Sequence, residues 1–83
     1  MTNDQTYVLA LKIRYQLNKR GMTQAELSHI TGIRPNAVSM LARGYIERLN
    51  IDHIERIANA LDITDINELV ELVPESEAGK YSE

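Results

Sequence analysis

Four polar side chains in one short stretch, TQAELSHITGIRPNAVS at residues 23–39, have little structural reason to be there: Gln24, Arg34, Asn36 and Ser39. Arginine at a helix start opposes the helix dipole and does not serve as an N-cap, so the local structure gains little from Arg34. Carboxamide, guanidinium and hydroxyl groups donate or accept hydrogen bonds without reacting. The chemistry that these residues suit is therefore recognition of an anion or of another polar partner.

The sequence contains no set of residues suited to catalysis or to metal binding. The chain has no cysteine, which excludes disulfides and cysteine-based zinc sites. His29 and His53 are too few for a metal site, and we interpret both as ordinary surface or edge histidines. No spacing fits a nucleophile–base pair or a phosphate-binding glycine loop. We therefore expect no enzymatic activity, no metal, no cofactor and no small-molecule ligand.

The charge of the chain is unevenly distributed. The formal net charge is −3, yet residues 1–50 hold seven Lys and Arg against three acids, whereas residues 51–83 hold two basic residues against nine acidic ones. The two balances are +4 and −7. This split allows an anion-binding face at one end and an acidic surface at the other, although two ordinary solvated surfaces would produce it equally well.

The chain is short enough for one small domain, since it has 83 residues. Its longest apolar runs fall well short of the roughly 20 residues that span a bilayer, and no basic region followed by an apolar stretch opens it. We expect a cytoplasmic protein without a membrane contact. We place the domain at residues 7–73 and expect residues 74–83, which are polar and acidic, to form a disordered tail.

Apolar spacing and capping residues predict five helices and no strand. The expected helices cover residues 7–20, 24–31, 35–43, 51–61 and 64–73. In the first of them Leu9, Ile13 and Leu17 recur every four residues, which is typical of an amphipathic helix. The core must come mainly from Leu, Ile, Val and Ala, because the aromatic residues are four tyrosines. The predicted fold class is all-α.

The connection between the second and third helices is predicted to be a tight turn. Thr23 and Glu26 fit a capping box at the start of the second helix. Gly32 supplies the positive φ that a short turn requires, and Pro35 suits the first turn of the next helix. Gly44 would end that helix. Two helices joined in this way describe a helix-turn-helix inside a small bundle.

The runs TQAELSHITGIRPNAVSMLARG and IDHIERIANALDITDINELVELVP resemble the Xre/Cro-type helix-turn-helix regulators of bacteria and phages, especially small stand-alone members with a TGIRPN turn and a VP ending. The resemblance covers roughly residues 8–74. It implies a five-helix, lambda-repressor-like domain that binds a double-stranded DNA operator and regulates transcription, with repression as the expected outcome. Ser28 stands where the family commonly has alanine, Thr31 where an apolar residue is usual, and Met40 where a polar side chain is.

The resemblance also implies roles for individual residues. The third helix would lie in the major groove, where each base pair displays a distinct hydrogen-bonding pattern. The base-reading positions match Arg34, Pro35, Asn36 and Met40, with Arg34 suited to guanine and Asn36 to adenine. Phosphate contacts are expected from Gln24 at the start of the second helix, from Ser39 and Arg43, and from Arg14 and Tyr45.

Two partner hypotheses stay open. The last expected helix carries more apolar residues than one helix face needs, namely Ile66, Leu69, Val70, Leu72 and Val73. An exposed remainder would suit a homodimer on a two-fold operator, unless the tail covers Leu72 or that residue is simply exposed. The alternative function is a protein-interaction module, of the antitoxin or anti-repressor type, that uses the acidic C-terminal helix and tail.

Overall fold

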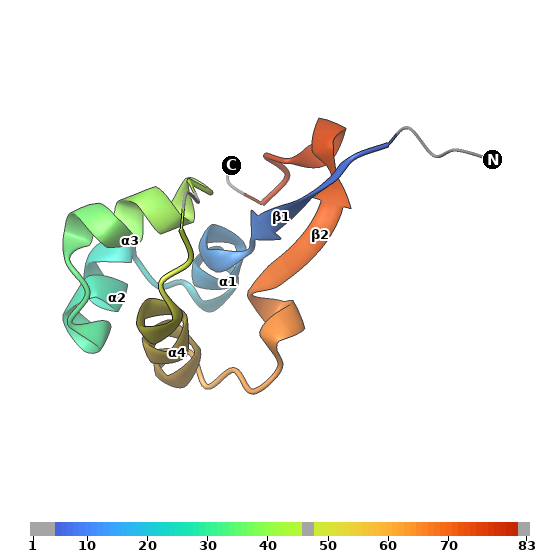
Figure 1. Ribbon diagram of the computed structural model, residues 1–83. Coiled ribbons are helices and arrows are strands. Elements are labelled where there is room, and N and C mark those ends of the chain that lie inside the picture. Colours follow the sequence, from blue (N-terminus) through green and yellow to red (C-terminus); the bar gives the residue numbers. More distant parts are fainter. Residues whose placement is uncertain (1–4, 46–47, 82–83) are drawn as a thin grey trace.

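The computed structural model describes residues 5–45 and 48–81, and over this part of the chain it has four helices beside a two-stranded sheet (Figure 1). The helices are α1 (Ile13–Arg20), α2 (Gln24–Thr31), α3 (Pro35–Ala42) and α4 (Ile51–Ala60). The strands are β1 (Tyr7–Leu11) and β2 (Val70–Pro74), and short 3₁₀ turns cover Ile66–Glu68 (η1) and Glu75–Glu77 (η2). In Figure 1, α1 lies between the sheet and the pair formed by α2 and α3.

The predicted five-helix, all-α fold is wrong at both ends of the domain. Residues 7–11 of the first expected helix form β1, and η1 and β2 replace the last expected helix at 64–73. The strands pair antiparallel, with Leu9 opposite Leu72 and Leu11 opposite Val70. Valines in both segments, and Tyr7 in β1, favour a strand only when a partner strand is present. That partner lies at the other end of the chain, where a local periodicity cannot detect it.

The three central helices are confirmed to within one residue at their ends, with α2 at Gln24–Thr31, α3 at Pro35–Ala42 and α4 at Ile51–Ala60. Each contributes to one core of Leu, Ile, Val and Ala, as expected from the composition. The largest fully buried side chains are Ile13, Leu17, Leu27, Ile57, Leu69, Val38 and Val73. Every element except the short 3₁₀ turns and β1 supplies at least one of them, so all four helices and β2 are held by the same core.

A buried polar cluster fixes α1 against the segment that leads into the sheet. Gln16 is 2% exposed, and its Nε2 donates to the carbonyl oxygen of Glu68 at 2.7 Å. Arg20 donates to Gln16 Oε1 through Nη1 and to the carbonyl oxygen of Leu61 through Nη2, the latter at 3.2 Å. A buried carboxamide is costly unless both its ends are paired, and here both are. These bonds join α1 to the end of α4 and to η1.

Residues 75–81 fold back onto α1 and the sheet, in contrast to the disordered tail that was expected for 74–83. Ser82 and Glu83 lie outside the described residues. The Tyr81 hydroxyl donates to Glu71 Oε1 at 2.6 Å, and the Tyr81 and Tyr15 rings meet edge to face with centroids 5.8 Å apart. Lys12 Nζ lies 3.0 Å from the same Glu71 oxygen. The acidic composition of the tail suggested disorder, but one aromatic side chain supplies the contact that holds it.

These tail contacts make the ionisation of Glu71 a measure of tail docking. The hydrogen bond from Tyr81, followed by that from Lys12, lowers the pKa of the Glu71 carboxyl. A lowered folded-state pKa contributes stability above the ordinary glutamate value, and this contribution is lost as the pH falls through the lowered value. We expect Tyr81→Phe to raise the pKa of Glu71 towards its ordinary value in a carboxyl carbon NMR titration. Tyr7→Phe, the control, should not change it, and an equal pKa in the Tyr81→Phe and wild-type proteins would mean that the tail is undocked.

Candidate nucleic-acid interface

The start of α2 is closed by the capping box that the sequence predicts. The amide of Glu26 donates to Thr23 Oγ1 at 3.0 Å, and the amide of Thr23 donates to Glu26 Oε1 at 3.0 Å. The second of these bonds is the main reason that the pKa of the Glu26 carboxyl is lowered. The amides of Gln24 and Ala25 hydrogen-bond none of the described residues, as expected for the first turn of a helix. They point to where an anion can bind.

The turn between α2 and α3 is fixed by backbone geometry and by α4. Gly32 has φ +75°, a left-handed conformation that glycine adopts without strain, and its amide donates to the Ser28 carbonyl at 2.9 Å. Arg56 of α4 donates to the Thr31 carbonyl at 3.2 Å and pairs with Asp52 at 2.9 Å. The helix-turn-helix is therefore attached to α4 as well as closed within itself.

Helix α3 has one buried stripe and one exposed stripe. Val38 is 0% exposed and Ala42 is 2% exposed, and these residues, four apart, face the core. Asn36, Met40 and Arg43, at spacings of four and three, are all exposed and form the opposite stripe. The burial of Val38 and Ala42 therefore decides which side chains of α3 point away from the protein.

The first residues of α3 carry hydrogen-bonding groups that the fold does not use. The Arg34 carbonyl accepts from the Val38 amide at 3.0 Å, but the Arg34 side chain makes no capping bond. Pro35 occupies the first helical turn and removes an amide that would have no helical partner. Arg34, Pro35 and Asn36 are exposed, and the side chains of Arg34 and Asn36 hydrogen-bond no other residue in the described chain. They are available to an external partner.

The end of α3 brings a cation and a ring together. Gly44 has φ +82°, and the amides of Gly44 and Tyr45 donate to the carbonyls of Leu41 and Met40, both at 3.0 Å. These two bonds form a Schellman cap, which turns the chain back along the helix. The turn places the Arg43 guanidinium 5.9 Å from the centroid of the Tyr45 ring. Arg43 and Tyr45, two of the predicted phosphate contacts, therefore lie side by side on the surface.

An open groove of about 320 Å³ runs beside the exposed stripe of α3. It contains Met40 and Tyr45, which the sequence identified, and also Arg48 and His53, which it did not. The residues that line it are Ala37, Met40, Leu41, Tyr45, Arg48, Asn50 and His53. Arg48 stands two residues before Asn50, the N-cap of α4, whose Oδ1 accepts from the His53 amide at 3.2 Å. The sequence offered one sign that Arg48 could belong to this surface, namely a basic residue just before the N-cap of a helix.

The remaining predicted site residues are less exposed. Gln24 and Ser39 are half-buried, at the start of α2 and in the middle of α3, and their side chains hydrogen-bond none of the described residues. Arg14 is half-buried in the first turn of α1, outside the helix-turn-helix. The structure thus gathers the candidates from α3 and its flanking turns on one surface. Gln24 adds the start of α2, and Arg14 comes from a separate element.

No group of three His, Asp or Glu side chains among the described residues is placed to hold a metal ion. None of the helices in the same part of the chain is long and apolar enough to cross a membrane.

Comparison with known proteins identifies this arrangement. The family model of the Cro/C1-type helix-turn-helix DNA-binding domain matches residues 12–75. The chain belongs to this Cro/C1-type family. The fold is similar to that of the transcriptional regulator VanUg in its crystal form II, with a TM-score of 0.65, 20% sequence identity, and coverage of 90% of this chain and 97% of that one. No curated protein matches the chain.

Ser28 and Thr31 of α2 have a structural role in the turn. Ser28 is 8% exposed, and its hydroxyl donates to the carbonyl of Ile33 at 2.5 Å. Thr31 donates to the carbonyl of Leu27 at 2.7 Å and accepts from the Ile33 amide at 3.2 Å. Both hydroxyls thus bind backbone groups of the turn itself. In this Cro/C1-type domain the turn is therefore held in part by two side-chain hydroxyls.

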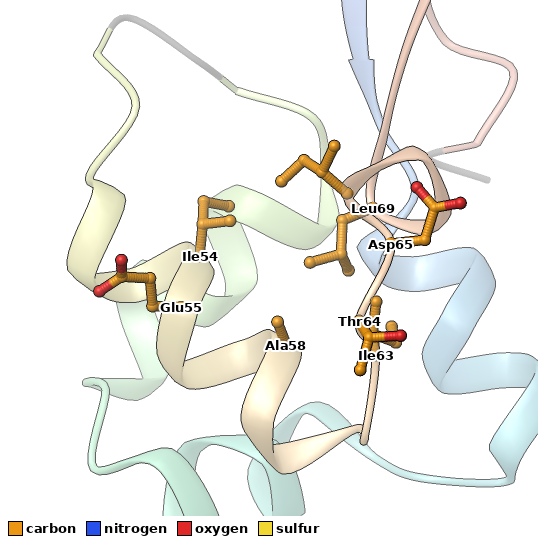
Figure 2. A pocket seen from close by; sticks show the side chains of 8 residues that line it. Ile54, Glu55, Ala58, Ile63, Thr64, Asp65 and Leu69 are labelled. Atoms are coloured by element: carbon orange, nitrogen blue, oxygen red, sulfur yellow. The ribbon is translucent and has the colours of Figure 1, made fainter.

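A second, smaller hollow lies between α4 and residues 63–69 (Figure 2). It measures about 170 Å³, and Figure 2 shows Ile54 and Ala58 of α4 on one side, with Ile63 and Leu69 on the other. Glu55 and Asp65 are also among its lining residues. In this Cro/C1-type domain the hollow belongs to α4 and η1, whereas the exposed stripe belongs to α3.

The left-handed turn at Gly32 gives a test of the helix-turn-helix geometry. A Cβ at Gly32 would meet Arg56 Nη1 at 3.5 Å, an ordinary contact, so the cost of Gly32→Ala comes from the backbone. We expect a loss of about 1–2 kcal/mol in the free energy of unfolding, measured by urea denaturation. Gly32→Asn should lose less, because asparagine tolerates a positive φ. Equal stability of Gly32→Ala and the wild type would contradict the observed turn.

Proposed function

We propose that this chain is a sequence-specific transcriptional repressor that acts in the cytoplasm and lays α3 in the major groove of operator DNA. The observation that carries the proposal is the start of the exposed stripe of α3, where the Arg34 and Asn36 side chains hydrogen-bond none of the described residues, although Val38 and Ala42 beneath them are firmly packed. Firm packing lowers the entropic cost of binding, because the reading side chains start from a fixed backbone. A bound repressor would act by excluding other proteins from the operator.

Base reading is assigned to the first half of α3. Arg34 presents a planar fork of donors that matches the O6 and N7 acceptors of guanine. Asn36, with one donor and one acceptor, matches N6 and N7 of adenine in the same way. Pro35 and Met40 are exposed apolar residues suited to a thymine methyl group. Met40 lies between Asn36 and Arg43 on the stripe, so an apolar contact would sit between two polar ones.

Phosphate binding is assigned to both sides of this reading surface. At the start of α2, the unpaired amides of Gln24 and Ala25 and the Gln24 carboxamide are suited to one phosphate, because the Glu26 carboxylate is drawn back to Thr23. At the end of α3, Arg43 and Tyr45 supply a charge and a hydroxyl beside the groove that Arg48 also lines. Ser39 and Arg14 complete the predicted set. Such contacts set the register without reading sequence.

The active form is proposed to be a homodimer on a two-fold operator. Of the apolar residues that the sequence marks as surplus, Leu69 and Val73 are buried at 0% and 1% exposure. Ile66 and Leu72 are 54% and 66% exposed. Fewer of these apolar residues are exposed than expected, but Ile66 and Leu72 lie on the surface and are suited to contact a second copy.

A protein-interaction module is the second candidate. It is favoured by the hollow of Figure 2, where an apolar floor lies next to the carboxylates of Glu55 and Asp65. The two functions separate in one NMR experiment. DNA reading requires that random duplex DNA at low salt shifts the signals of Gln24, Arg34, Asn36 and Ser39. Shifts confined to residues 62–81 on addition of a protein partner, with none from DNA, would favour the interaction module.

Replacing Arg34 should alter specificity. We expect Arg34→Ala to weaken operator binding by about 1–3 kcal/mol and to relax the preference at one base pair, because a forked contact to one base is lost. Gln24→Ala should weaken binding evenly, that is, by about the same factor for every DNA sequence. A selection from a random DNA library, followed by gel-shift titration, measures both effects.

The control for this pair is Lys80→Ala, which removes a cation from the tail rather than from the reading surface. It should leave the base preferences unchanged. If Arg34→Ala and Gln24→Ala both kept the wild-type affinity, the placement of α3 in the groove would be wrong.

The salt dependence of binding separates charged from neutral phosphate contacts. Each phosphate neutralised by a cation contributes about 0.9 to the slope of log K against log salt concentration. We expect Arg43→Ala to reduce that slope by about 0.9, and Gln24→Ala to lower the affinity without changing it. Fluorescence anisotropy with a labelled duplex at several salt concentrations measures the slopes. An unchanged slope in Arg43→Ala would remove Arg43 from the phosphate contacts.

A further inference from the structure

The outer edge of β2 has backbone groups that are free to pair with another strand. The amide of Lys12 donates to the Leu69 carbonyl at 2.8 Å, and the amide of Glu75 donates to the Thr6 carbonyl at 2.8 Å. In an antiparallel ladder these bonded pairs alternate, so the backbone groups of Val70, Leu72 and Pro74 point away from β1. No described residue hydrogen-bonds to that edge. An edge of this kind is a template for a further strand.

The two strands also carry apolar side chains on one face of the sheet. Leu9 and Leu72 are opposite each other in the ladder, so their side chains lie on the same face. Leu72 is 66% exposed and Leu9 is 37% exposed. On the opposite face Ala10 and Val73 are 3% and 1% exposed. The face with Ala10 and Val73 is thus buried in the domain, whereas on the other face Leu72 is largely exposed and Leu9 beside it is partly exposed.

We propose that β2 pairs antiparallel with β2 of a second copy, so that the two domains share one four-stranded sheet. The pairing is centred on Leu72, which lies opposite Leu72 of the second copy. Each Leu72 amide then donates to the other Leu72 carbonyl, and each Val70 amide donates to the other Pro74 carbonyl. A row of four leucines, Leu9 and Leu72 from each copy, crosses the shared face. The inference rests on the proposed homodimer and names its interface.

The residues of β2 select this register. Pro74 has no amide, so it can end the pairing as an acceptor but cannot take a central position. Centring on Leu72 places Glu71 opposite Val73, whereas centring on Glu71 would bring two carboxylates face to face. Glu71 is in any case held on its own domain by Tyr81 and Lys12. The register with Leu72 at the centre therefore avoids like charges and uses the available backbone donors.

The edge of β1 is a poorer place for the same pairing. Its outward residues are Tyr7, Leu9 and Leu11, and Leu11 is only 3% exposed. A second strand would therefore be blocked at that end of β1. On β2 the corresponding residues, Val70, Leu72 and Pro74, are all at least partly exposed. Two strands alone are marginally stable, so extension to four also strengthens the sheet itself.

Single cysteines test this interface without interference, because the chain has no cysteine of its own. In a hydrogen-bonded antiparallel pair the two Cα atoms are about 5.5 Å apart, within the range of a disulfide. We expect Leu72→Cys to form a disulfide-linked dimer under mild oxidation in the absence of DNA. Leu9→Cys should not, because three strand spacings of about 4.8 Å separate the two copies of that residue. Ile66→Cys, on η1, is the control for an interface at the hollow of Figure 2.

A proline distinguishes strand pairing from side-chain packing alone. The Leu72 amide points outward, so Leu72→Pro removes a donor to the second copy and none to β1, whereas Leu72→Ala shortens the side chain and keeps the donor. We expect the dimer dissociation constant of Leu72→Pro, measured by sedimentation equilibrium, to exceed that of Leu72→Ala by about tenfold or more. An amide NMR spectrum verifies that both variants are folded.

Several outcomes would overturn the interface. Disulfide formation by Leu9→Cys or Ile66→Cys but not by Leu72→Cys would place it elsewhere, a monomeric wild-type protein would remove it, and equal dissociation constants of the two Leu72 variants would exclude strand pairing. DNA reading is tested separately with a single half-site duplex at low salt. If monomeric Leu72→Pro still binds that duplex, the proposed function holds whatever the fate of the interface.

Discussion

The orientation of α3 depends on the hydrogen-bonded turn at residues 31–33. Only a few backbone and side-chain groups define it, namely the left-handed Gly32, the hydroxyls of Ser28 and Thr31, and the guanidinium of Arg56. The side chains of Leu27, Ile33 and Val38, each at most 3% exposed, pack on its inner side. Because the inner side is filled and the turn is bonded, α3 has one way to face outward. Every proposed DNA contact of α3 depends on that single arrangement.

Within residues 23–39, the residues that stabilise the local structure differ from those that are proposed to bind DNA. Thr23 and Glu26 pair with each other, which closes the start of α2 and at the same time draws the Glu26 carboxylate away from the free amides of Gln24 and Ala25. Helix α3 starts at Pro35 without a side-chain cap, so the Arg34 side chain has no structural role at the helix start. The local structure is thus complete without the groups that are proposed to bind. This is the condition under which such groups can be optimised for a partner without loss of stability.

The parts of the fold that were predicted correctly depend on residues near each other in the chain. Gly32 and Gly44 both have positive φ, and the capping box at Thr23 is present, because these features are set within one helical turn. The sheet was missed because Leu9 and Leu72 become partners only when both ends of the chain meet. For the same reason Arg48 and His53 were not recognised as neighbours of Met40.

The acidic net charge of the chain does not oppose DNA binding, because most of the basic and acidic residues lie on different helices and strands. The exposed arginines Arg34 and Arg43 border α3, and Arg48 lines the groove beside it. The acidic residues of the second half are carried by α4, the connection to η1, η1 itself, β2 and the tail, and Glu71 among them is paired with Lys12. A molecule with such an uneven charge distribution is attracted to a polyanion through the surface that carries these arginines. Approach of DNA to the acidic segments is disfavoured, so the charge distribution favours encounters that begin at the arginines.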